Sequence, residues 1–339
     1  MITALAAEAH AEPTLRAPSP FVSLRDHRDA GRALGLFTRE GGALRWTDRG
    51  LGVLEALRAL VADAAAALGF APGQVTPAPA PRVSPAWLLD EEVGDVDAIE
   101  VRACAREARR AVDLAGRVGG ALGLSSLEVV VAGDPALAAA LGARVRAARV
   151  TRVEARAVDR VGRSWQVLRL TSTGDILRGA LLGGAPRALA LVLEHLAGAL
   201  PPWLAPEQVR VLPIGRASAD GLVAALAAAG VPATIAVDGP LGSRVGAAAA
   251  ARVPYLAFVG DDEAALGAVR VRARGGAASA RVTQAEFVAH LRDDREARRL
   301  APRLPGEPPR DATTNDATDG RRVVTEQRVK KERLPSASR

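Results

Sequence analysis

The feature that most constrains the fold of this chain is a continuous stretch at residues 179–214, in which glycine, apolar residues and proline follow one another. Gly183-Gly184 stand near its start, and glycine lets a backbone approach a neighbouring strand or a ligand closely. Apolar residues then recur at helical spacing over residues 187–200 until Pro201-Pro202, which a helix cannot pass through. The apolar run at residues 209–214 is suited to a strand buried on both faces. The stretch therefore predicts a strand, a helix, a proline-bounded crossing and a strand that opens a second unit.

The rest of the chain predicts mixed α/β structure, because each apolar run has either a helical or a strand period. A strong helix is expected at residues 53–68, with Leu54, Leu57 and Val61 on its apolar face and Gly69 at its end. Before residue 175 we also expect a short helix within 26–37, strands at 43–47, 74–77, 127–131, 152–158 and 165–170, and helices at 103–122 and 135–146. After residue 205 the chain alternates strands at 209–214, 233–237, 255–259 and 269–273 with helices at 219–229, 243–251 and 284–299. The fold class expected is α/β: an α+β antiparallel sheet core, then an α/β unit with a mixed five-stranded sheet.

Composition narrows the kind of protein. Hydrophobic residues make up 49% of the 339 residues but aromatic ones only 3%, so the cores are expected to be mostly alanine, valine and leucine. The one cysteine, Cys104, excludes an internal disulfide and a cysteine-rich zinc site. No apolar run is long enough to cross a membrane and no signal peptide pattern is present, so we expect a soluble, cytoplasmic protein.

The net charge of +7 comes almost wholly from arginine, since Lys330 and Lys331 are the only lysines. Such a charge suits a polyanionic partner. A high-GC coding bias also replaces lysine by arginine, so the composition leaves both explanations open. At the two ends, residues 1–20 are predicted to be a flexible arm, and residues 301–339 a disordered basic tail.

Several short motifs give the chain a resemblance to a known family. They are Asp26-His27-Arg28 with Leu34-Gly35-Leu36-Phe37, Gly162-Arg163-Ser164-Trp165-Gln166, the run from Pro201 through Trp203-Leu204-Ala205-Pro206 to Gln208, Arg252-Val253-Pro254-Tyr255, and Val259-Gly260-Asp261. Together they resemble threonyl-tRNA synthetase over about residues 21–300. The resemblance implies a degenerate class II aminoacyl-tRNA synthetase-like core at residues 21–204. It also implies an anticodon-binding-type α/β domain at residues 205–300, with no editing domain ahead of the core.

The resemblance extends to a candidate dimer contact. In the family, a long helix followed by a strand that ends in proline is motif 1, which builds the dimer interface of class II synthetases. Residues 53–77 match this pattern, and so imply a homodimer or a heterodimer with a related synthetase-like protein. An ordinary helix–strand hairpin explains the same residues, and this alternative stays open.

The chain departs from the family where the chemistry takes place. Motif 2, which grips the α-phosphate of ATP, has no counterpart in the short acidic segment at residues 88–100. The resemblance places Arg187 at the nucleotide-binding arginine of motif 3, but Pro186 replaces the preceding glutamate, and an exposed helix start also explains Arg187. Two of the family's three zinc ligands fall in the missing segment, and the third corresponds to Arg178, which cannot bind a metal. We therefore expect no catalytic residues, no cofactor and no metal.

The anticodon-binding part keeps the family's order of strands and helices better than it keeps the residues that contact the anticodon. In the family a loop of pattern N-E-K-x-G-x-K-x-R-E reads anticodon bases. The corresponding residues 238–247 keep only Gly242 and, at a lysine position, Arg244. Arginines that could still contact RNA phosphates are Arg244, Arg252, Arg270, Arg272 and Arg274. Strand alternation places the last three on one face, although plain solvent exposure explains that face equally.

Three functions remain open from the sequence. The first is a threonyl-tRNA synthetase-like paralogue, a pseudoenzyme without aminoacylation activity that acts as a tRNA-binding or regulatory protein. The second is a regulatory partner subunit that docks through the class II dimer face, around residues 54–75, without RNA. The third is an active ligase with a rebuilt site, which would need a new α-phosphate donor from residues 102–110.

Overall fold

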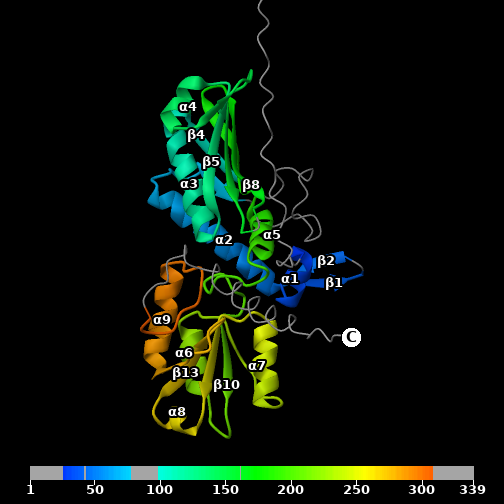
Figure 1. Cartoon of the computed structure of the whole chain (residues 1–339), viewed down its shortest axis with the longest axis vertical. Coiled ribbons are helices and arrows are strands. Elements are labelled where there is room, and N and C mark those ends of the chain that lie inside the picture. Colours follow the sequence, from blue (N-terminus) through cyan, green and yellow to red (C-terminus); the bar gives the residue numbers. More distant parts are fainter. Residues whose placement is uncertain (1–25, 42, 78–97, 161, 308–339) are drawn as a thin grey trace, which may run out of the picture.

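The computed structural model describes residues 26–41, 43–77, 98–160 and 162–307. It contains two units stacked along the long axis, a larger one around a seven-stranded sheet and a smaller one around a five-stranded sheet (Figure 1). The predicted α/β fold class is thus confirmed. Within the described ranges, no helix combines the length and apolar character that crossing a bilayer requires. The arm predicted at residues 1–20 lies outside the described residues.

The larger sheet is almost wholly antiparallel. Its strand order is β3-β4-β9-β8-β7-β5-β6, and only the β5–β6 pair is parallel. The strands are β3 (Val75–Pro77), β4 (Ile99–Cys104), β5 (Ser125–Ala132), β6 (Arg144–Arg146), β7 (Arg152–Val158), β8 (Ser164–Thr173) and β9 (Ile176–Leu181). Helix α3 (Ala108–Ala121) packs against β4, β5, β7 and β8. Alternate strand residues such as Val101, Val153 and Leu170 are fully buried in the same core.

Two helices of this unit are shorter than the sequence predicted. The helix expected at residues 103–122 begins only at Ala108, because the residues before it form β4 inside the sheet. The helix expected at residues 135–146 is α4 (Pro135–Leu141), and Gly142 ends it with a φ of 62°. Glycine adopts this left-handed conformation readily because it has no Cβ. The chain then turns into β6.

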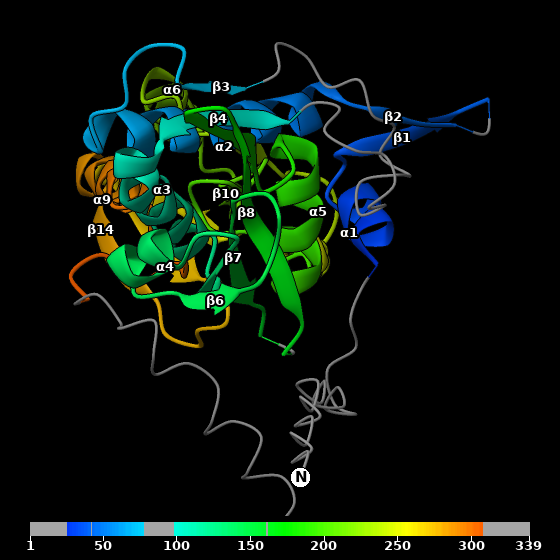
Figure 2. The same cartoon turned by 90° about the horizontal axis from the view of Figure 1, so that it is seen from above.

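Helix α2 (Asp48–Ala67) begins earlier than predicted. The Thr47 hydroxyl accepts a hydrogen bond from the Gly50 amide at 3.1 Å, which caps the helix before the glycines that were expected to open it. A Cβ on Gly50 would lie 2.4 Å from the carbonyl oxygen of Leu36, so glycine is required by close packing. Leu36 precedes the hairpin of β1 (Phe37–Glu40) and β2 (Ala43–Trp46), which projects to one side of the larger unit (Figure 2).

The apolar face of α2 lies inside the protein. Leu54, Leu57 and Val61 are buried, and α2 packs against α3 and against α5 (Ala185–His195). The face predicted to make a dimer contact is therefore covered by this same chain. Dimer formation stays a prediction, but this face no longer supports it.

Helix α5 ends before the proline pair that was expected to stop it. Ala197 and Gly198 adopt left-handed conformations, and the Gly198 amide donates to the Leu193 carbonyl at 2.8 Å. This arrangement closes the end of a helix, so Pro201-Pro202 instead shape the crossing to the smaller unit. Trp203 is buried at that crossing, as the sequence predicted.

A buried ionic network ties α5 to the turn between β7 and β8 and to α1 (His27–Ala33). Asp159 accepts from Arg163 Nε at 2.6 Å and from Trp165 Nε1 at 2.9 Å. Arg163 Nη1 also donates to Glu194 at 2.8 Å, and Glu194 lies 2.9 Å from the ring of His27. Burial alone would raise the pKa of Asp159, but the hydrogen bonds from Trp165 and Arg163 outweigh it and hold that pKa below its usual value. Much of the resemblance in this unit therefore rests on residues that hold its elements together.

The smaller sheet is mixed, as predicted, in the order β11-β10-β12-β13-β14. Its strands are β10 (Val209–Pro213), β11 (Ala233–Ile235), β12 (Tyr255–Val259), β13 (Ala268–Ala273) and β14 (Ala280–Thr283). Its helices are α6 (Asp220–Ala228), α7 (Leu241–Ala250), α8 (Asp261–Ala265) and α9 (Gln284–Glu296). The β10–β11 and β10–β12 pairs are parallel, and β13 pairs antiparallel with β12 and β14. β14 and α8 were not among the predicted elements.

The first residues of the predicted tail are ordered. Asp294, fully buried on α9, accepts from the Tyr255 hydroxyl at 2.6 Å and from Arg303 at 3.0 Å. Leu304 is buried in the same core. The prediction of a disordered tail from residue 301 is therefore wrong for residues 301–307, because an ion pair and an apolar contact hold them. Residues 308–339 lie outside the described residues.

The two units meet at a half-buried arginine that follows β13. Arg274 donates to the carbonyl oxygens of Leu200 at 2.8 Å, Ala199 at 3.1 Å, and Arg252. The first two carbonyls belong to the crossing and the third to the smaller unit, so one guanidinium joins both. Burial, with the nearby charge of Arg252, lowers the pKa of Arg274 to about 10.

Candidate nucleic-acid interface

The two faces of the five-stranded sheet are covered unequally. On one face Val211, Tyr255 and Val271 are buried in a core shared with α6 and α9. On the other face α7 packs over Leu212 and Leu256, in the half of the sheet nearest β10. Beyond them, no helix contributes to a core over β13 and β14 on this side, among the described residues. The half-open face is where functional side chains can lie.

One row of side chains crosses this open half. Antiparallel register places Phe258 opposite Arg270, and Arg270 opposite Arg281. Directly paired strand residues project from the same face, so these three side chains are neighbours. Arg272 lies two residues along β13, with its guanidinium carbon 5.6 Å from the centre of the Phe258 ring. We call Phe258, Arg270, Arg272 and Arg281 the arginine face.

Glu263 balances part of this charge. Its Oε1 lies 3.4 Å from both Arg270 Nη2 and Arg281 Nε. Burial alone would raise the pKa of Glu263, but the Gly260 amide and the charge of Arg281 outweigh it and hold that pKa below its usual value. One carboxylate therefore faces three arginines, and the arginine face keeps a net positive charge.

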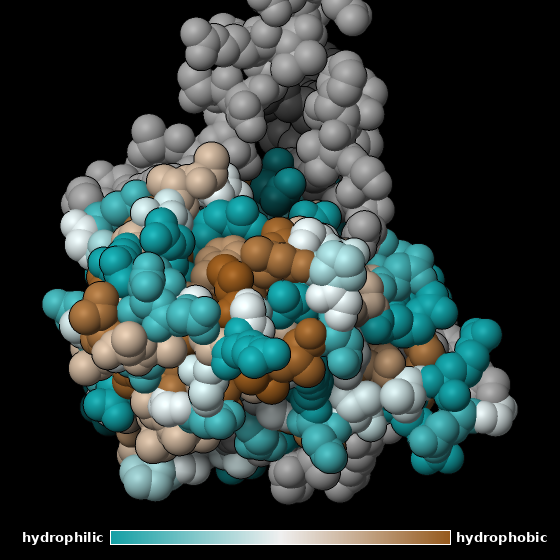
Figure 3. Space-filling view, turned by 90° about the horizontal axis from the view of Figure 1, so that it is seen from below, coloured by the Kyte–Doolittle hydropathy of each residue, from teal (hydrophilic) through white to brown (hydrophobic). Residues whose placement is uncertain are grey.

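Exposed apolar residues also lie at the carboxyl ends of β10 and β11, where Ile235 pairs with Val211 and so projects from the face opposite Phe258. Ile214, Ile235 and Val237 are 40%, 42% and 60% exposed. The Ile214 amide donates to Val259, the last residue of β12, so this edge lies next to Phe258. Seen from this end, hydrophobic side chains gather near the centre and hydrophilic ones surround them (Figure 3).

The arrangement suits single-stranded nucleic acid. Arginines on a strand face can bind backbone phosphates, and aromatic or apolar side chains beside them offer a surface for unstacked bases. A guanidinium group can bind phosphates and can also contact a guanine edge, and the Phe258 ring can stack on any base. The arginine face therefore supports binding to a nucleic-acid strand and does not by itself select one sequence.

The structure divides the five predicted RNA-binding arginines. Arg270 and Arg272 lie on the arginine face, as predicted. Arg244 does not reach it, because its Nη1 donates to the carbonyls of Pro213 and Ala236 at 2.9 and 2.8 Å. Arg244 therefore joins the carboxyl ends of β10 and β11.

Arg274 and Arg252 lie at the junction of the units. Arg274 was predicted to share the face of Arg270 and Arg272, but β13 ends at Ala273 and the chain turns there. Its guanidinium donates to the backbone carbonyls of Leu200 and Ala199, so plain solvent exposure does not explain this arginine, and its contact with RNA stays a prediction. Arg252 ends α7 and lines a cavity between the units.

Arg187 begins α5 and packs against the preceding loop. A Cβ on Gly183 would lie 2.6 Å from Arg187 Cδ, so the arginine stem lies over the glycine backbone. Arg187 thus lies in the first turn of α5, where its predicted role requires it, and its contact with a nucleotide stays a prediction. Arg178, at the position of a family zinc ligand, pairs with Glu100. Among the described residues, no group of three or more histidine, cysteine, aspartate and glutamate side chains could hold a metal ion.

Sequence reasoning missed Phe258, Arg281 and Glu263. Phe258 carries no signal in the sequence, since β12 is apolar along its whole length and its other four residues are buried. Arg281 lies in a short strand that follows an alanine- and glycine-rich turn, and no apolar period marks it. Glu263 reaches both arginines from a five-residue helix, which only the tertiary structure places there.

Comparison with known proteins supports a nucleic-acid role for related chains. Residues 208–294 match the family model described as anticodon binding domain. The threonine–tRNA ligase of Desulfovibrio desulfuricans is 31% identical over 169 residues, which are 43% of this chain and 26% of that protein. The enzyme of Leifsonia xyli is 33% identical over 176 residues, 45% of this chain and 24% of that protein. The match thus spans about a quarter of the length of these relatives.

A solved structure has the same fold. The RNA binding domain of threonyl-tRNA synthetase from Cryptosporidium parvum superposes with a TM-score of 0.63, at 14% identity, over 83% of this chain and 99% of that one. At this identity the likeness concerns the fold alone. The resemblance to threonyl-tRNA synthetase is confirmed over about 40% of the chain, and its residues 208–294 match the anticodon binding domain family.

Proposed function

We propose that this chain is a cytoplasmic, threonyl-tRNA synthetase-like protein that binds tRNA and does not aminoacylate it. The observation that carries the proposal is the arginine face, which lies within the residues that match the anticodon binding domain. We also propose that the chain divides functionally into residues 21–204, a degenerate class II core, and residues 205–300, the RNA-binding part.

The binding should depend mainly on phosphates. Arg270, Arg272 and Arg281 present three cations around one aromatic ring, and Glu263 offsets one of them. The loop at residues 238–247, which reads bases in the family, keeps only Gly242 and Arg244. Because Arg244 donates to two carbonyls, it is held away from a ligand. Discrimination between tRNAs should therefore be weak.

The loss of chemistry rests on the residues around the former active site. The segment that would carry motif 2 is reduced to residues 88–100, most of which lie outside the described residues. Arg178 and Arg102 both pair with Glu100 on the open face of the larger sheet. Two arginines and one carboxylate in mutual contact supply neither a zinc site nor a free triphosphate clamp.

A rebuilt ligase finds little support. The candidate α-phosphate donors at residues 102–110 have partners in the fold. Arg109 donates to the Ala140 carbonyl at 3.2 Å, and Arg110 to the Gly69 carbonyl at 3.0 Å. Pyrophosphate exchange with each of the twenty amino acids should give no signal above background. An exchange signal that Arg187→Ala abolishes would overturn the inactive assignment.

The second candidate function is a regulatory partner subunit. Such a subunit would have to dock through a surface other than the predicted α2 face. The α2 face is buried, whereas Ile214, Ile235 and Val237 are exposed. Only Ile214, whose amide donates to Val259, lies beside β12 and the arginine face. Sedimentation at micromolar concentration measures whether the 35.0 kDa chain is a monomer or a dimer.

The test of RNA binding is filter binding of purified tRNAs over a salt series. Affinity should fall by roughly 0.7 to 0.9 log units per phosphate contact for each log unit of salt. The variant Arg270→Ala/Arg272→Ala/Arg281→Ala should bind every tRNA more weakly and show a slope shallower by about two to three units. A matched control, Arg106→Ala/Arg117→Ala/Arg292→Ala, removes the same charge at exposed positions outside the arginine face.

Two outcomes contradict the proposal. Absence of binding near 100 mM salt, roughly where nonspecific complexes are still micromolar, would leave a protein partner as the better explanation. Equal losses in the triple variant and in its control would show that net charge, and not the arginine face, holds the RNA. Strong selectivity for threonine tRNA would instead place base recognition on residues not identified above.

A further inference from the structure

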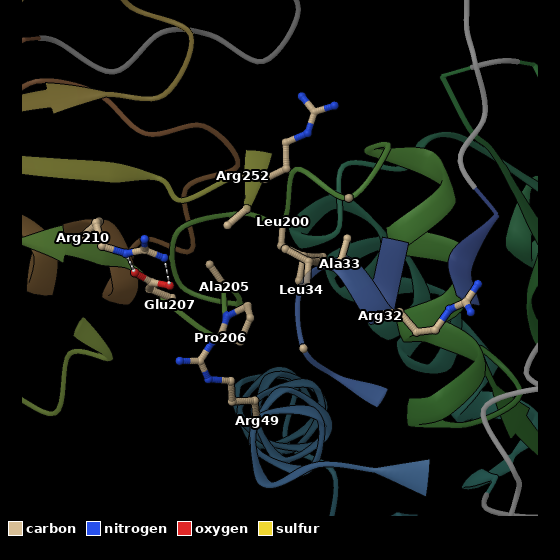
Figure 4. Close-up of a pocket in the computed structure, with 13 residues that line it drawn as sticks. Arg32, Ala33, Leu34, Arg49, Leu200, Ala205, Pro206, Glu207, Arg210 and Arg252 are labelled. Carbon is tan, nitrogen blue, oxygen red and sulfur yellow. Dashed lines mark hydrogen bonds and ion pairs between the residues drawn. The ribbon is translucent and has the colours of Figure 1, made fainter. Parts of the chain in front are cut away.

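A cavity of about 210 Å³ lies where the two units meet. Its apolar centre includes Leu34 and Leu200 from the larger unit and the crossing, together with Ala205 and Pro206. Four arginines line it: Arg32, Arg49, Arg210 and Arg252. Figure 4 shows the apolar residues near the centre of the view and the four guanidinium groups around them. Glu207 is the one carboxylate among the lining residues.

The four arginines differ in how their charge is balanced. Arg210 forms a bidentate pair with Glu207, and Arg32 pairs with Asp29. Arg49 and Arg252 make no side-chain hydrogen bond or ion pair with any described residue. One of them comes from each unit. The cavity therefore holds two cations without a balancing anion, beside an apolar surface that lowers the local dielectric constant.

Both of these arginines also stand where the local backbone disfavours them. Arg252 follows α7 with a φ of 56°, and the next amide, that of Val253, donates back to Ala248. This is the helix-end position that glycine normally fills, and a residue with a Cβ adopts it at a cost of roughly 1 to 2 kcal/mol. Arg49 lies in the first turn of α2, where the helix dipole opposes a positive charge. Neither placement is explained by the stability of the fold.

We propose that this cavity binds a phosphate-bearing ligand, held by Arg49 of one unit and Arg252 of the other. The Arg252 and Arg32 side chains point away from the apolar centre, so the guanidinium groups do not converge on one point (Figure 4), which suits an extended chain of phosphates better than one small ion. Two sources present this chemistry: an RNA backbone and a free polyphosphate. The first rests on the proposed function, whereas the second is independent of it.

The bound phosphates would also bridge the units. Arg32 and Arg49 belong to the larger unit, and Arg210 and Arg252 to the smaller. A ligand that contacts cations of both units adds its binding free energy to their association, because it binds only when they are held together. A ligand on the arginine face would not bridge the units in this way, since all residues of that face lie in the smaller unit.

The experiment uses the full chain and two ligands, inorganic pyrophosphate by calorimetry and tRNA by filter binding. The test variant is Arg49→Gln/Arg252→Gly, in which glycine keeps the left-handed helix end and so preserves the fold. The control is Arg39→Gln/Arg292→Gln, which removes one exposed arginine from each unit away from the cavity. Loss of each charge-assisted contact should weaken binding at least about tenfold.

The ligand whose binding the test variant weakens identifies the source of the phosphates. Pyrophosphate binding that the test variant weakens and the control does not supports a free polyphosphate. A selective loss of tRNA affinity supports the RNA backbone, and loss of both supports a site open to either. Unchanged affinity of the test variant for both ligands, or no binding of either, overturns the proposal. If the triple variant of the arginine face loses tRNA while the cavity variant keeps both affinities, the proposed function stands and this inference fails.

Discussion

Two charged clusters, one in each unit, are used in opposite ways. In the larger unit, Asp159, Arg163 and Glu194 are joined in a network, and Arg163 belongs to a motif that resembles threonyl-tRNA synthetase. In the smaller unit, Arg270 and Arg281 stand at the surface with a single carboxylate between them. Similar residue types therefore stabilise the fold in one unit and remain free for a ligand in the other.

This difference shows what a family motif can retain when the chemistry is gone. The segment at residues 162–166 keeps its pattern because Arg163 and Trp165 both bind Asp159. A side chain that completes a buried network is required for folding whether or not the site is active. The resemblance at residues 162–166 is thus an argument about structure, and it does not depend on an active site.

The largest effect should come from breaking the buried network. Asp159→Ala leaves Arg163 and the Trp165 indole without their carboxylate, and should lower the free energy of unfolding by about 3 to 5 kcal/mol. The control Asp175→Ala removes an exposed carboxylate from the turn after β8. Urea unfolding followed by circular dichroism measures both. A loss below about 1 kcal/mol would mean that the network is not structural.

The same network predicts an acid dependence. Folding lowers the pKa of Asp159 and of Glu194, so their contribution to stability is complete above the unfolded values of about 3.9 and 4.3 and is lost as the pH falls below them. The wild type should therefore lose more stability than Asp159→Ala between pH 5 and pH 3, roughly the range of carboxyl titration. Parallel curves for the two proteins would contradict the assignment.

Next in size is the loss of the arginine that joins the units. Arg274→Met leaves three carbonyl groups without a donor and should lower the free energy of unfolding by about 2 to 3 kcal/mol. All four tryptophans precede residue 204, so tryptophan fluorescence reports the larger unit while circular dichroism reports both. The two transitions should coincide in the wild type and separate in Arg274→Met. Arg272→Met, two residues earlier, is the control and should leave them coincident.

A smaller effect is expected from the aromatic residue of the arginine face. Phe258→Leu keeps apolar volume but removes the ring, and should weaken single-stranded RNA binding by about 1 kcal/mol, roughly fivefold. The larger unit offers a matched control, since Arg110 lies 5.7 Å from the Phe70 ring, close to the 5.6 Å between Arg272 and Phe258. Phe70→Leu should leave RNA affinity unchanged. Equal losses would erase the distinction between the units.

The smallest effect is a gain. Glu263→Gln removes the carboxylate that neutralises Arg270 and Arg281, and should strengthen tRNA binding by about threefold at low salt, with a steeper salt dependence. Glu55→Gln removes an exposed partner of Arg58 in the larger unit and should leave the tRNA affinity and its salt dependence unchanged. Weaker binding of Glu263→Gln would mean that Glu263 positions the arginines more than it screens them.

Much of the fold follows from the sequence where apolar pattern and breakers agree. The strands β7 and β12 were predicted with the bounds that the structure has, since β7 alternates apolar and charged residues and Pro254 and Gly260 flank β12. β14 and α8 escaped because they are short, with four and five residues. The start of α2 was misplaced because Gly50 is there for close packing, which a sequence does not display.

The candidate site was predictable only in part. Alternation along residues 269–274 correctly paired Arg270 with Arg272, but it could not show that β13 ends at Ala273. Arg244 and Arg274 were assigned to RNA because an arginine in a sequence carries no sign of a carbonyl acceptor distant along the chain. Arg281 could be added only once β14 was known to pair with β13.

Arg274 has a consequence for how this protein can change over evolutionary time. Its three acceptors are the carbonyl oxygens of Ala199, Leu200 and Arg252, and every amino acid carries such an oxygen. Substitution at those three positions therefore cannot remove an acceptor, whereas substitution of Arg274 removes all of the donors at once. This contact between the units therefore depends on one codon, whichever side chains stand at its three acceptor positions.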